Sequence, residues 1–130
     1  ALRRNIAEGH PGRYIGIDLA NWAGSLITGP YAEVGEMIHG DSIESIAKLD
    51  CKVDLFVSDS DHSVDYERGE YETIADKLTQ NAIVIADNAH VTNELQRFAM
   101  STGRRFLYFQ EHPVKHWSRM SAPGIGFCFR

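Results

Sequence analysis

Cysteine and long apolar runs are both scarce in this sequence of 130 residues, and each shortage excludes a class of protein. The two cysteines, Cys51 and Cys128, are too few for a disulfide scaffold, and their spacing matches no metal site. We therefore expect two reduced thiols in a cytoplasmic protein. No apolar stretch approaches the roughly 20 residues that cross a bilayer, so we expect no membrane partner.

Basic residues are in deficit as well. The chain has 13 Lys and Arg residues against 18 Asp and Glu residues, which gives a formal net charge of −5. The pairs Arg3-Arg4 and Arg104-Arg105 belong to no continuous basic patch of the kind that neutralises nucleic-acid phosphates. We expect no nucleic-acid partner. The length and a hydrophobic content of 43% fit one globular domain over residues 1–130.

Two apolar runs in the chain each end abruptly in polar side chains. Residues 53–58 and 82–86 are short and rich in β-branched and aliphatic residues, as buried strands of a parallel sheet are. The carboxyl ends of such strands meet at one edge of an open α/β sheet, and ligands bind at that edge. The side chains that this pattern brings there are Asp59, Asp61, His62, Asp87, Asn88 and His90.

Strand and helix patterns alternate along most of the chain. The expected strands cover residues 13–18, 37–39, 53–58, 82–86, 105–110 and 124–129. Expected helices end at Gly9, follow the capping pair Asp41 and Ser42, span residues 65–79, and run from a cap at Thr92 to Gly103. The last two strands have no helical pattern between them, in residues 112–123, so they are expected to pair antiparallel. The order predicts an α/β fold, mostly parallel with a C-terminal antiparallel hairpin.

Periodicity also predicts which side chains lie inside. In the helix over residues 65–79 the inward positions are Tyr71, Ile74, Ala75 and Leu78. Glu67 and Glu70 of the same helix are expected in solvent. The aromatic residues expected to be buried are Trp22, Phe106, Tyr108, Phe127 and Phe129.

Four short segments follow one another in a characteristic order. They are Gly16-Ile17-Asp18, Gly40-Asp41-Ser42, Asp54-Leu55-Phe56-Val57-Ser58-Asp59-Ser60-Asp61-His62 and Ile85-Ala86-Asp87-Asn88. Together they resemble the class I S-adenosylmethionine-dependent methyltransferases, and more narrowly the O-methyltransferase branch that includes the catechol and caffeoyl-CoA enzymes. The resemblance implies a Rossmann-like sheet, S-adenosylmethionine as cofactor, and a small-molecule hydroxyl as methyl acceptor.

The resemblance implies a cofactor role for three residues of the first two segments. Asp18 matches the acid that binds the ribose hydroxyls of the cofactor. A carboxylate suits this task because it can accept two hydrogen bonds at once. Asp41 and Ser42 match the pair beside the adenine ring.

The resemblance implies that the other two segments form the part of the site that binds the methyl acceptor. Asp59, Asp87 and Asn88 match the oxygen ligands of a divalent cation such as Mg²⁺, which prefers carboxylate and carbonyl oxygens. His62 stands where related enzymes often carry a lysine general base. An imidazole, with an ordinary pKa of about 6.5, can accept a proton near neutral pH.

The sequence departs from the family pattern at its start, which leaves several alternatives open. The first strand and the glycine-rich loop of the family would lie before residue 1, so a domain incomplete at its N-terminus is expected. One alternative is an inactive methyltransferase-like fold that acts as a binding or oligomeric module, such as a homodimer. Another is a haloacid-dehalogenase-like phosphatase, because Asp59-Ser60-Asp61 follows an apolar strand. Strand-end acids can also be helix caps, and Asp87-Asn88 is a common turn pair.

Overall fold

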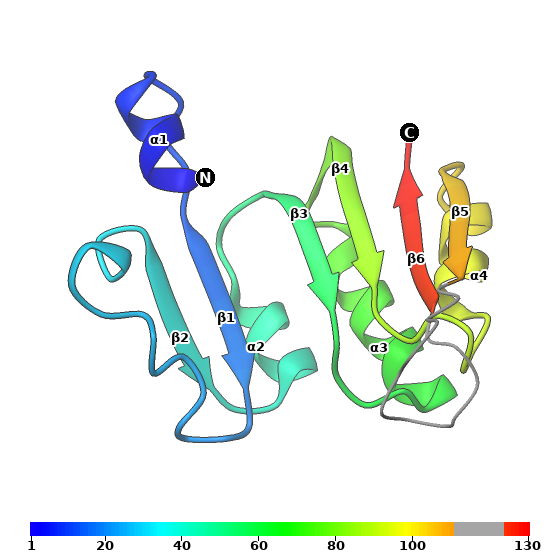
Figure 1. Ribbon diagram of the computed structural model, residues 1–130. Coiled ribbons are helices and arrows are strands. Elements are labelled where there is room, and N and C mark those ends of the chain that lie inside the picture. The colour runs from blue at the N-terminus through cyan, green and yellow to red at the C-terminus, as the bar shows by residue number, and fades with distance from the viewer. Residues whose placement is uncertain (111–123) are drawn as a thin grey trace. The chain divides into compact units, whose positions relative to one another are not determined.

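The computed structural model describes residues 1–110 and 124–130, which are coloured in Figure 1. The described residues form two compact units, Ala1–Lys48 and Leu49–Arg130. The single domain expected over residues 1–130 stays a prediction. The segment 112–123, expected to connect the last two strands, lies outside the described residues.

The first unit contains a two-stranded parallel sheet. Its elements in chain order are α1 (Leu2–Ala7), β1 (Tyr14–Asp18), the 3-10 helix η1 (Gly29–Tyr31), β2 (Gly35–His39) and α2 (Ser42–Lys48). The register pairs Tyr14 with Gly35 and Asp18 with His39, so both predicted strands are confirmed. The chain leaves α1 through Gly9, whose φ of +85° lies in the left-handed region that glycine adopts readily.

The second unit contains a four-stranded sheet with its helices on one face (Figure 1). Its elements are β3 (Val53–Ser58), α3 (Val64–Ala75), β4 (Leu78–Ala86), α4 (Glu94–Ser101), β5 (Arg105–Gln110) and β6 (Gly124–Phe129). The strand order is β3-β4-β6-β5; β3 and β4 are parallel, and β6 is antiparallel to both of its neighbours. The predicted α/β fold with a C-terminal antiparallel hairpin is confirmed. Among the described residues, no helix has the length and apolar character needed to span a bilayer.

The helix predicted over residues 65–79 is shorter than expected. α3 ends at Ala75, and β4 begins at Leu78 rather than at the start of the strand predicted over residues 82–86. Leu78 explains the error, because it continues the apolar stripe of α3 but is buried as a strand residue paired with Val53. A buried residue that continues the helical repeat can belong to the next strand, and the sequence pattern does not distinguish this case from a longer helix.

The core of the second unit lies between one face of the sheet and the helices α3 and α4 (Figure 1). The rings of Tyr71 and Phe98 connect the two helices, with centroids 5.6 Å apart. The predicted inward positions of Tyr71 and Ile74 are confirmed. The buried apolar residues of this unit are Tyr71, Ile74, Leu78, Ala82, Val84, Ala86, Leu95, Phe98, Ala99 and Cys128.

Two glutamates of α3 are buried, and the prediction that they lie in solvent is wrong. Glu67 and Glu70 are each 2% exposed. Glu67 precedes Tyr71 by four residues and Ile74 by seven, so the helical repeat places it on the buried stripe. A buried carboxylate needs hydrogen bonds to offset its desolvation, and both glutamates accept them from hydroxyl groups.

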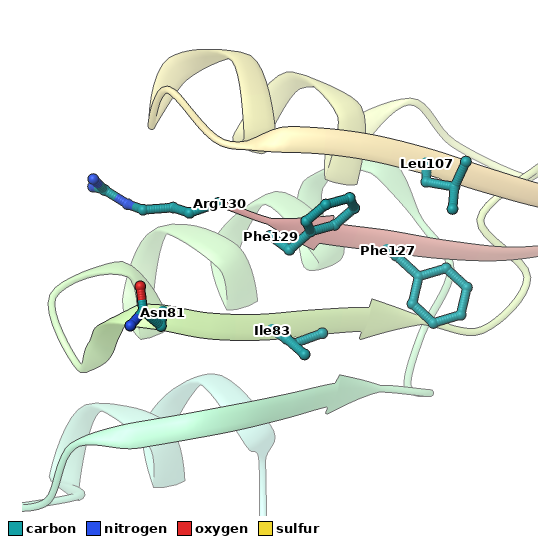
Figure 2. Close-up of a pocket in the computed structure, with 6 residues that line it drawn as sticks. All are labelled: Asn81, Ile83, Leu107, Phe127, Phe129 and Arg130. Carbon is teal, nitrogen blue, oxygen red and sulfur yellow. The ribbon is translucent and has the colours of Figure 1, made fainter.

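The other face of the four-stranded sheet is apolar and exposed. Neighbouring residues of a strand face opposite sides, so alternate side chains project away from the helices. We call this surface the open face; it consists of Leu55, Val57, Ile83, Leu107, Phe109, Phe127 and Phe129. A hollow of about 430 Å³ lies on it. Figure 2 shows the residues that line the hollow, which are Asn81, Ile83, Leu107, Phe127, Phe129 and Arg130.

The aromatic residues of the hairpin are half-buried, so the prediction that they lie in the core is wrong. The residues concerned are Phe106, Tyr108, Phe127 and Phe129. Strand pairing divides them between the two faces: Phe106 is opposite the buried Cys128, whereas Phe127 is opposite the exposed Leu107. On the open face the guanidinium carbon of Arg105 lies 5.2 Å from the centroid of the Phe129 ring, as in a cation–π contact.

The prediction that Trp22 is buried is also wrong. It is 77% exposed rather than packed, and its neighbours Leu19 and Leu26 are 77% and 85% exposed. All three lie in the turns between β1 and η1, where Gly24 has a φ of +77°. A segment of turns forms no continuous apolar face that could cover an indole ring.

Candidate functional site

The two polar strand ends predicted from the sequence are adjacent in the structure. β3 and β4 are parallel neighbours, and their last residues, Ser58 and Ala86, are opposite each other. The backbone N–H of Asp87 donates to the carbonyl oxygen of Ser58 at 3.0 Å. This pairing places Asp59 and Asp87 at the same edge of the sheet, as expected for parallel strands.

Three side chains converge at this edge. Asp59, His62 and Asp87 each offer a ligand atom, and these atoms all lie within 4.8 Å of one another. Nε2 of His62 is 3.9 Å from Oδ1 of Asp59. The Asp59 side chain is 69% exposed and that of His62 is 25% exposed, so a ligand can reach both. We call these three residues the strand-end cluster.

Asn88 adjoins the strand-end cluster through its amide nitrogen. Nδ2 lies 2.9 Å from Oδ2 of Asp87 and 3.2 Å from Nε2 of His62. Its backbone φ is +48°, a left-handed conformation that asparagine adopts more readily than most residues. The predicted metal ligand is the amide oxygen of Asn88, and that atom would face the cluster only after the amide group rotates.

Glu67 holds the other side of the His62 ring, a role that the sequence reasoning missed. Oε1 of Glu67 lies 3.3 Å from Nδ1 of His62, and Oε2 accepts a hydrogen bond from the hydroxyl of Thr92. α3 supplies Glu67, and the loop before α4 supplies Thr92. The spacing of Glu67 from Tyr71 was the available signal, because it places a carboxylate on a buried helical stripe.

A second buried carboxylate lies one turn further along α3. Oε2 of Glu70 accepts hydrogen bonds from Ser58 at 2.9 Å and Ser60 at 2.8 Å, which ties the end of β3 to the helix. Nearby, burial raises the pKa of Tyr71 well above its usual range, and the charge of Glu67 adds to the effect. The hydrogen bonds of Glu70 therefore connect α3 to the strand end that carries Asp59.

Two of the residues predicted for the sheet edge lie outside the cluster. Oδ1 of Asp61 accepts the backbone N–H of Ser63 at 2.8 Å, so Asp61 shapes the turn before α3. His90 is exposed and lines a separate hollow of about 230 Å³ together with Thr92, Phe106 and Tyr108. Position at a strand end is therefore not enough to place a residue in the cluster.

The predicted cofactor residues lie at the carboxyl ends of β1 and β2 in the first unit. Asp18 is exposed, and its Oδ1 accepts the backbone N–H of Ala20 at 2.7 Å. The carbonyl oxygen of Asp18 accepts the N–H of Gly40 at 3.0 Å, which joins the two strand ends. Asp41 is half-buried and caps α2 by accepting the N–H of Glu44 at 2.9 Å. Ser42 is the first residue of that helix.

The part of the chain that contains both groups of strand-end residues matches a known family. Residues 1–89, more than half of the chain, match a family described as a methyltransferase domain. The chain belongs to this methyltransferase family. The matched residues contain β1 to β4 of this methyltransferase domain, with every predicted cofactor and metal residue.

Solved structures share the fold of this methyltransferase domain. The O-methyltransferase TomG from Streptomyces achromogenes, in complex with SAM, is 16% identical with a TM-score of 0.70; the match covers 95% of this chain and 65% of that one. The Bacillus cereus O-methyltransferase, in complex with SAH, is 16% identical with a TM-score of 0.67, and the match covers 96% and 67% of the two chains.

A Klebsiella pneumoniae protein, provisionally described as an O-methyltransferase, is 13% identical with a TM-score of 0.69; the match covers 91% of this chain and 61% of that one. A comparison with curated protein sequences gave no match. At these identities the solved structures show the fold, and the chain spans about two thirds of their length. The family match and this fold confirm the resemblance to class I methyltransferases.

Proposed function

We propose that this methyltransferase domain takes part in S-adenosylmethionine-dependent methyl transfer to a hydroxyl of a small molecule, assisted by a divalent cation. The observation that carries the proposal is the strand-end cluster, in which Asp59, His62 and Asp87 bring ligand atoms within 4.8 Å of one another. A base beside two carboxylates suits the deprotonation and positioning of an acceptor hydroxyl. Both cysteines are free thiols, which favours a cytoplasmic location.

His62 is the proposed general base. Its side chain is 25% exposed, so an acceptor can approach the ring, and Glu67 lies 3.3 Å from Nδ1 on the other side of the ring. Nε2 would take up the hydroxyl proton as the acceptor oxygen bonds to the methyl group and the bond from that methyl group to the cofactor sulfur breaks, which would leave S-adenosylhomocysteine. When bound, S-adenosylmethionine supplies that methyl group as an electrophile attached to a positively charged sulfur. General base catalysis of this kind contributes about 10²- to 10⁴-fold to a rate.

Asp59 and Asp87 are the proposed ligands of the cation. Two carboxylates suit Mg²⁺ and Mn²⁺, and a cation there would lower the pKa of the acceptor hydroxyl. His62 cannot bind the cation and accept the proton through the same Nε2. We therefore propose Asn88 as the third ligand, through its amide oxygen, which leaves Nε2 of His62 to the acceptor.

Asp18, Asp41 and Ser42 are the proposed cofactor residues. The Asp18 carboxylate is exposed at the end of β1 and uses Oδ1 in one short-range hydrogen bond. A carboxylate has about four lone-pair sites, so Asp18 keeps the capacity to accept both ribose hydroxyls. The donor set therefore fits the cofactor, with Asp41 and Ser42 at the neighbouring strand end.

Calorimetry with S-adenosylmethionine and S-adenosylhomocysteine tests the cofactor part of the proposal. The wild-type chain should bind both, and Asp18→Ala should weaken binding at least about tenfold, because hydrogen bonds to a charged group contribute about 1.5–3 kcal/mol. Glu33→Ala, which removes an exposed acid from the same unit, is the control. Failure of the wild type to bind either compound would contradict the proposal.

The open face supports the alternative that this domain is an assembly module. Four strands about 4.8 Å apart, with a rise of about 3.3 Å per residue, present roughly 400 Å² in projection. The largest apolar patch on a typical monomeric protein is about 300–600 Å² and is often a binding surface, so the open face has the size of such a surface. Five of its side chains, Leu55, Val57, Ile83, Leu107 and Phe109, are 43–58% exposed. A second copy of this chain could cover the face through a two-fold interface, which would form a homodimer.

Sedimentation equilibrium tests this alternative. If the open face forms a dimer, the wild-type chain should be dimeric at micromolar concentration and Leu107→Lys should be monomeric. Met100→Lys, which adds the same charge at a 75% exposed position on α4, should leave the dimer unchanged. A monomeric wild type would exclude the homodimer.

The phosphatase alternative depends on Asp59 and Asp61 acting as a pair. Asp61 is engaged in the turn to Ser63, whereas Asp59 faces His62, and the family match favours methyl transfer. A screen with generic phosphate esters, with Asp59→Asn as control, tests the alternative. Hydrolysis that disappears in the variant would favour a phosphatase over the proposed methyltransferase.

A further inference from the structure

A buried carboxylate lies behind the ring of His62, on the side away from Asp59. Glu67 is 2% exposed, and its Oε1 is 3.3 Å from Nδ1 of His62. Its other oxygen accepts the Thr92 hydroxyl, and Thr92 Oγ1 in turn accepts the backbone N–H of Glu94 at 3.2 Å. The carboxylate is therefore fixed from two sides, by the start of α4 and by the imidazole.

The donor and acceptor chemistry of these groups fixes where the proton of a neutral His62 ring lies. A backbone N–H can only donate, so the Thr92 oxygen accepts from Glu94 and its own hydroxyl proton points to Glu67. An ionised carboxylate can only accept. The contact between Glu67 and His62 is therefore a hydrogen bond only if Nδ1 of His62 carries a proton.

The opposite side of the ring leads independently to the same tautomer. Nδ2 of Asn88 lies within hydrogen-bonding distance of both Asp87 Oδ2 and His62 Nε2. An amide nitrogen is a donor with two protons, and it satisfies both contacts at once only if Nε2 of His62 is an acceptor. Without a cation between them, the reversed amide would set its oxygen against a carboxylate oxygen of Asp87, which is repulsive.

We propose that Glu67 is a positioning residue that holds neutral His62 in the tautomer with its proton on Nδ1, which keeps the lone pair on Nε2, the nitrogen on the side of the strand-end cluster. The proposal deepens the proposed function and rests on it, because the tautomer matters for catalysis only if His62 is the base. In the other tautomer Nε2 would carry a proton and could not accept one from the acceptor hydroxyl. Glu67 also faces the imidazolium that forms when Nε2 gains its proton, and a carboxylate at Nδ1 stabilises that charge.

Nitrogen-15 NMR of the histidine rings measures the tautomer directly, without cofactor, cation or acceptor. The protein is labelled at its histidine nitrogens and studied at a pH where the ring is neutral, and His62→Gln identifies the His62 signals by their loss. The wild-type spectrum should show a protonated Nδ1 and an unprotonated Nε2, with this form favoured about tenfold or more, given the strength of hydrogen bonds to charged groups. A wild-type ring protonated on Nε2 would overturn the proposal.

Two substitutions of Glu67 test whether this residue causes the preference. Glu67→Leu removes the acceptor, and the preference for the Nδ1 proton should fall by about tenfold. Glu67→Gln keeps a carbonyl acceptor without the charge, so it should retain part of the preference and rescue the leucine variant. An unchanged tautomer in both variants would assign the preference to Asn88 alone and overturn the role of Glu67.

Glu70→Gln is the matched control, because Glu70 is equally buried on the same helix and accepts its hydrogen bonds from Ser58 and Ser60. It should lower stability without shifting the His62 tautomer; a shift as large as that of Glu67→Leu would show a general structural effect and contradict the proposal. The measurement is independent of methyl transfer. The predicted tautomer without cofactor binding would count against the proposed function alone, and cofactor binding with the opposite tautomer would count against Glu67 alone.

Discussion

The amide nitrogen of Asn88 lies 3.2 Å from Nε2 of His62, although the two residues are 26 positions apart in the sequence. The contact joins the ends of two parallel strands through the atom that a general base would use. As long as Asn88 donates to Nε2, the lone pair of His62 is occupied. Rotation of the amide would turn its oxygen toward the strand-end cluster and free Nε2 in the same movement, so a cation bound by that oxygen would favour the active form of the base.

The backbone of Asn88 gives a prediction about stability. Its φ of +48° is in the left-handed region, which costs an alanine about 1–2 kcal/mol and a glycine almost nothing. Asn88→Ala and Asn88→Gly lose the same side-chain hydrogen bonds. Urea denaturation should therefore give Asn88→Gly a free energy of unfolding about 1 kcal/mol higher than that of Asn88→Ala. Equal stabilities would show that the backbone is not held in this conformation.

Tyr71 offers a substitution that should stabilise the protein. Its hydroxyl is buried without a hydrogen-bond partner among the described residues, while the nearby Ser58 hydroxyl donates to Glu70. An unsatisfied buried polar group costs about 1–3 kcal/mol, so Tyr71→Phe should raise the free energy of unfolding by about 1 kcal/mol. A loss of 1 kcal/mol or more in urea denaturation would show that Tyr71 is paired in solution, for example with Ser58.

The strand ends could be predicted from the sequence because they depend on short-range patterns. An apolar run followed by an acid places Asp59 and Asp87 at the edge of a parallel sheet, and the family resemblance supplies a role for each. The hairpin strands were also found, with the bounds Arg105–Gln110 and Gly124–Phe129, because aromatic residues cluster there.

Features that depend on tertiary contacts could not be predicted in the same way. Charge indicated that Glu67 and Glu70 face solvent, but the hydroxyls of Thr92 and Ser58 satisfy the two carboxylates from outside the helix. Hydrophobicity indicated that Phe127 lies in the core, but it belongs to the open face and is only half-buried. Both errors arise because a residue type gives its preferred environment and not its actual neighbours.

Cys128 gives the protein a dependence on alkaline pH. Burial raises the pKa of its thiol above the ordinary value, and the charge of Arg104 opposes the shift. Because the pKa is higher in the folded chain than in the unfolded one, where it is about 8.5, the unfolded chain loses its thiol proton first as pH rises. The stabilisation is complete below about pH 8.5 and is lost as pH rises through the folded pKa.

Urea denaturation at a series of pH values checks this dependence. The free energy of unfolding of the wild type should decline as pH rises above about 8.5, and Cys128→Ala should remove most of the decline. Cys51→Ala, which removes the half-buried thiol, is the control. A decline that persists in Cys128→Ala would have another origin.

Glu94 connects α3 to α4 and should contribute to stability. It is 4% exposed, and its carboxylate accepts hydrogen bonds from Arg68 at 3.1 Å and from Arg97 at 3.1 Å. It also lies in the first turn of α4, where a negative charge is favourable. Glu94→Gln should lower the free energy of unfolding by about 1–2 kcal/mol, whereas Glu72→Gln, at an exposed position of α3, should change it by less than about 0.5 kcal/mol. Equal effects would contradict this role.

Binding of Mn²⁺ tests the central claim most directly, because the strand-end cluster is the feature on which the proposed function depends. Calorimetric titration of the wild type with Mn²⁺ is compared with Asp59→Asn, Asp87→Asn and the control Asp61→Asn, whose carboxylate shapes the adjacent turn. We expect binding by the wild type and by Asp61→Asn, and a loss of at least about tenfold in each of the other two variants. A wild type that binds no Mn²⁺, or variants of Asp59 and Asp87 that bind it as tightly as the wild type, would contradict a cation site at this edge of the sheet.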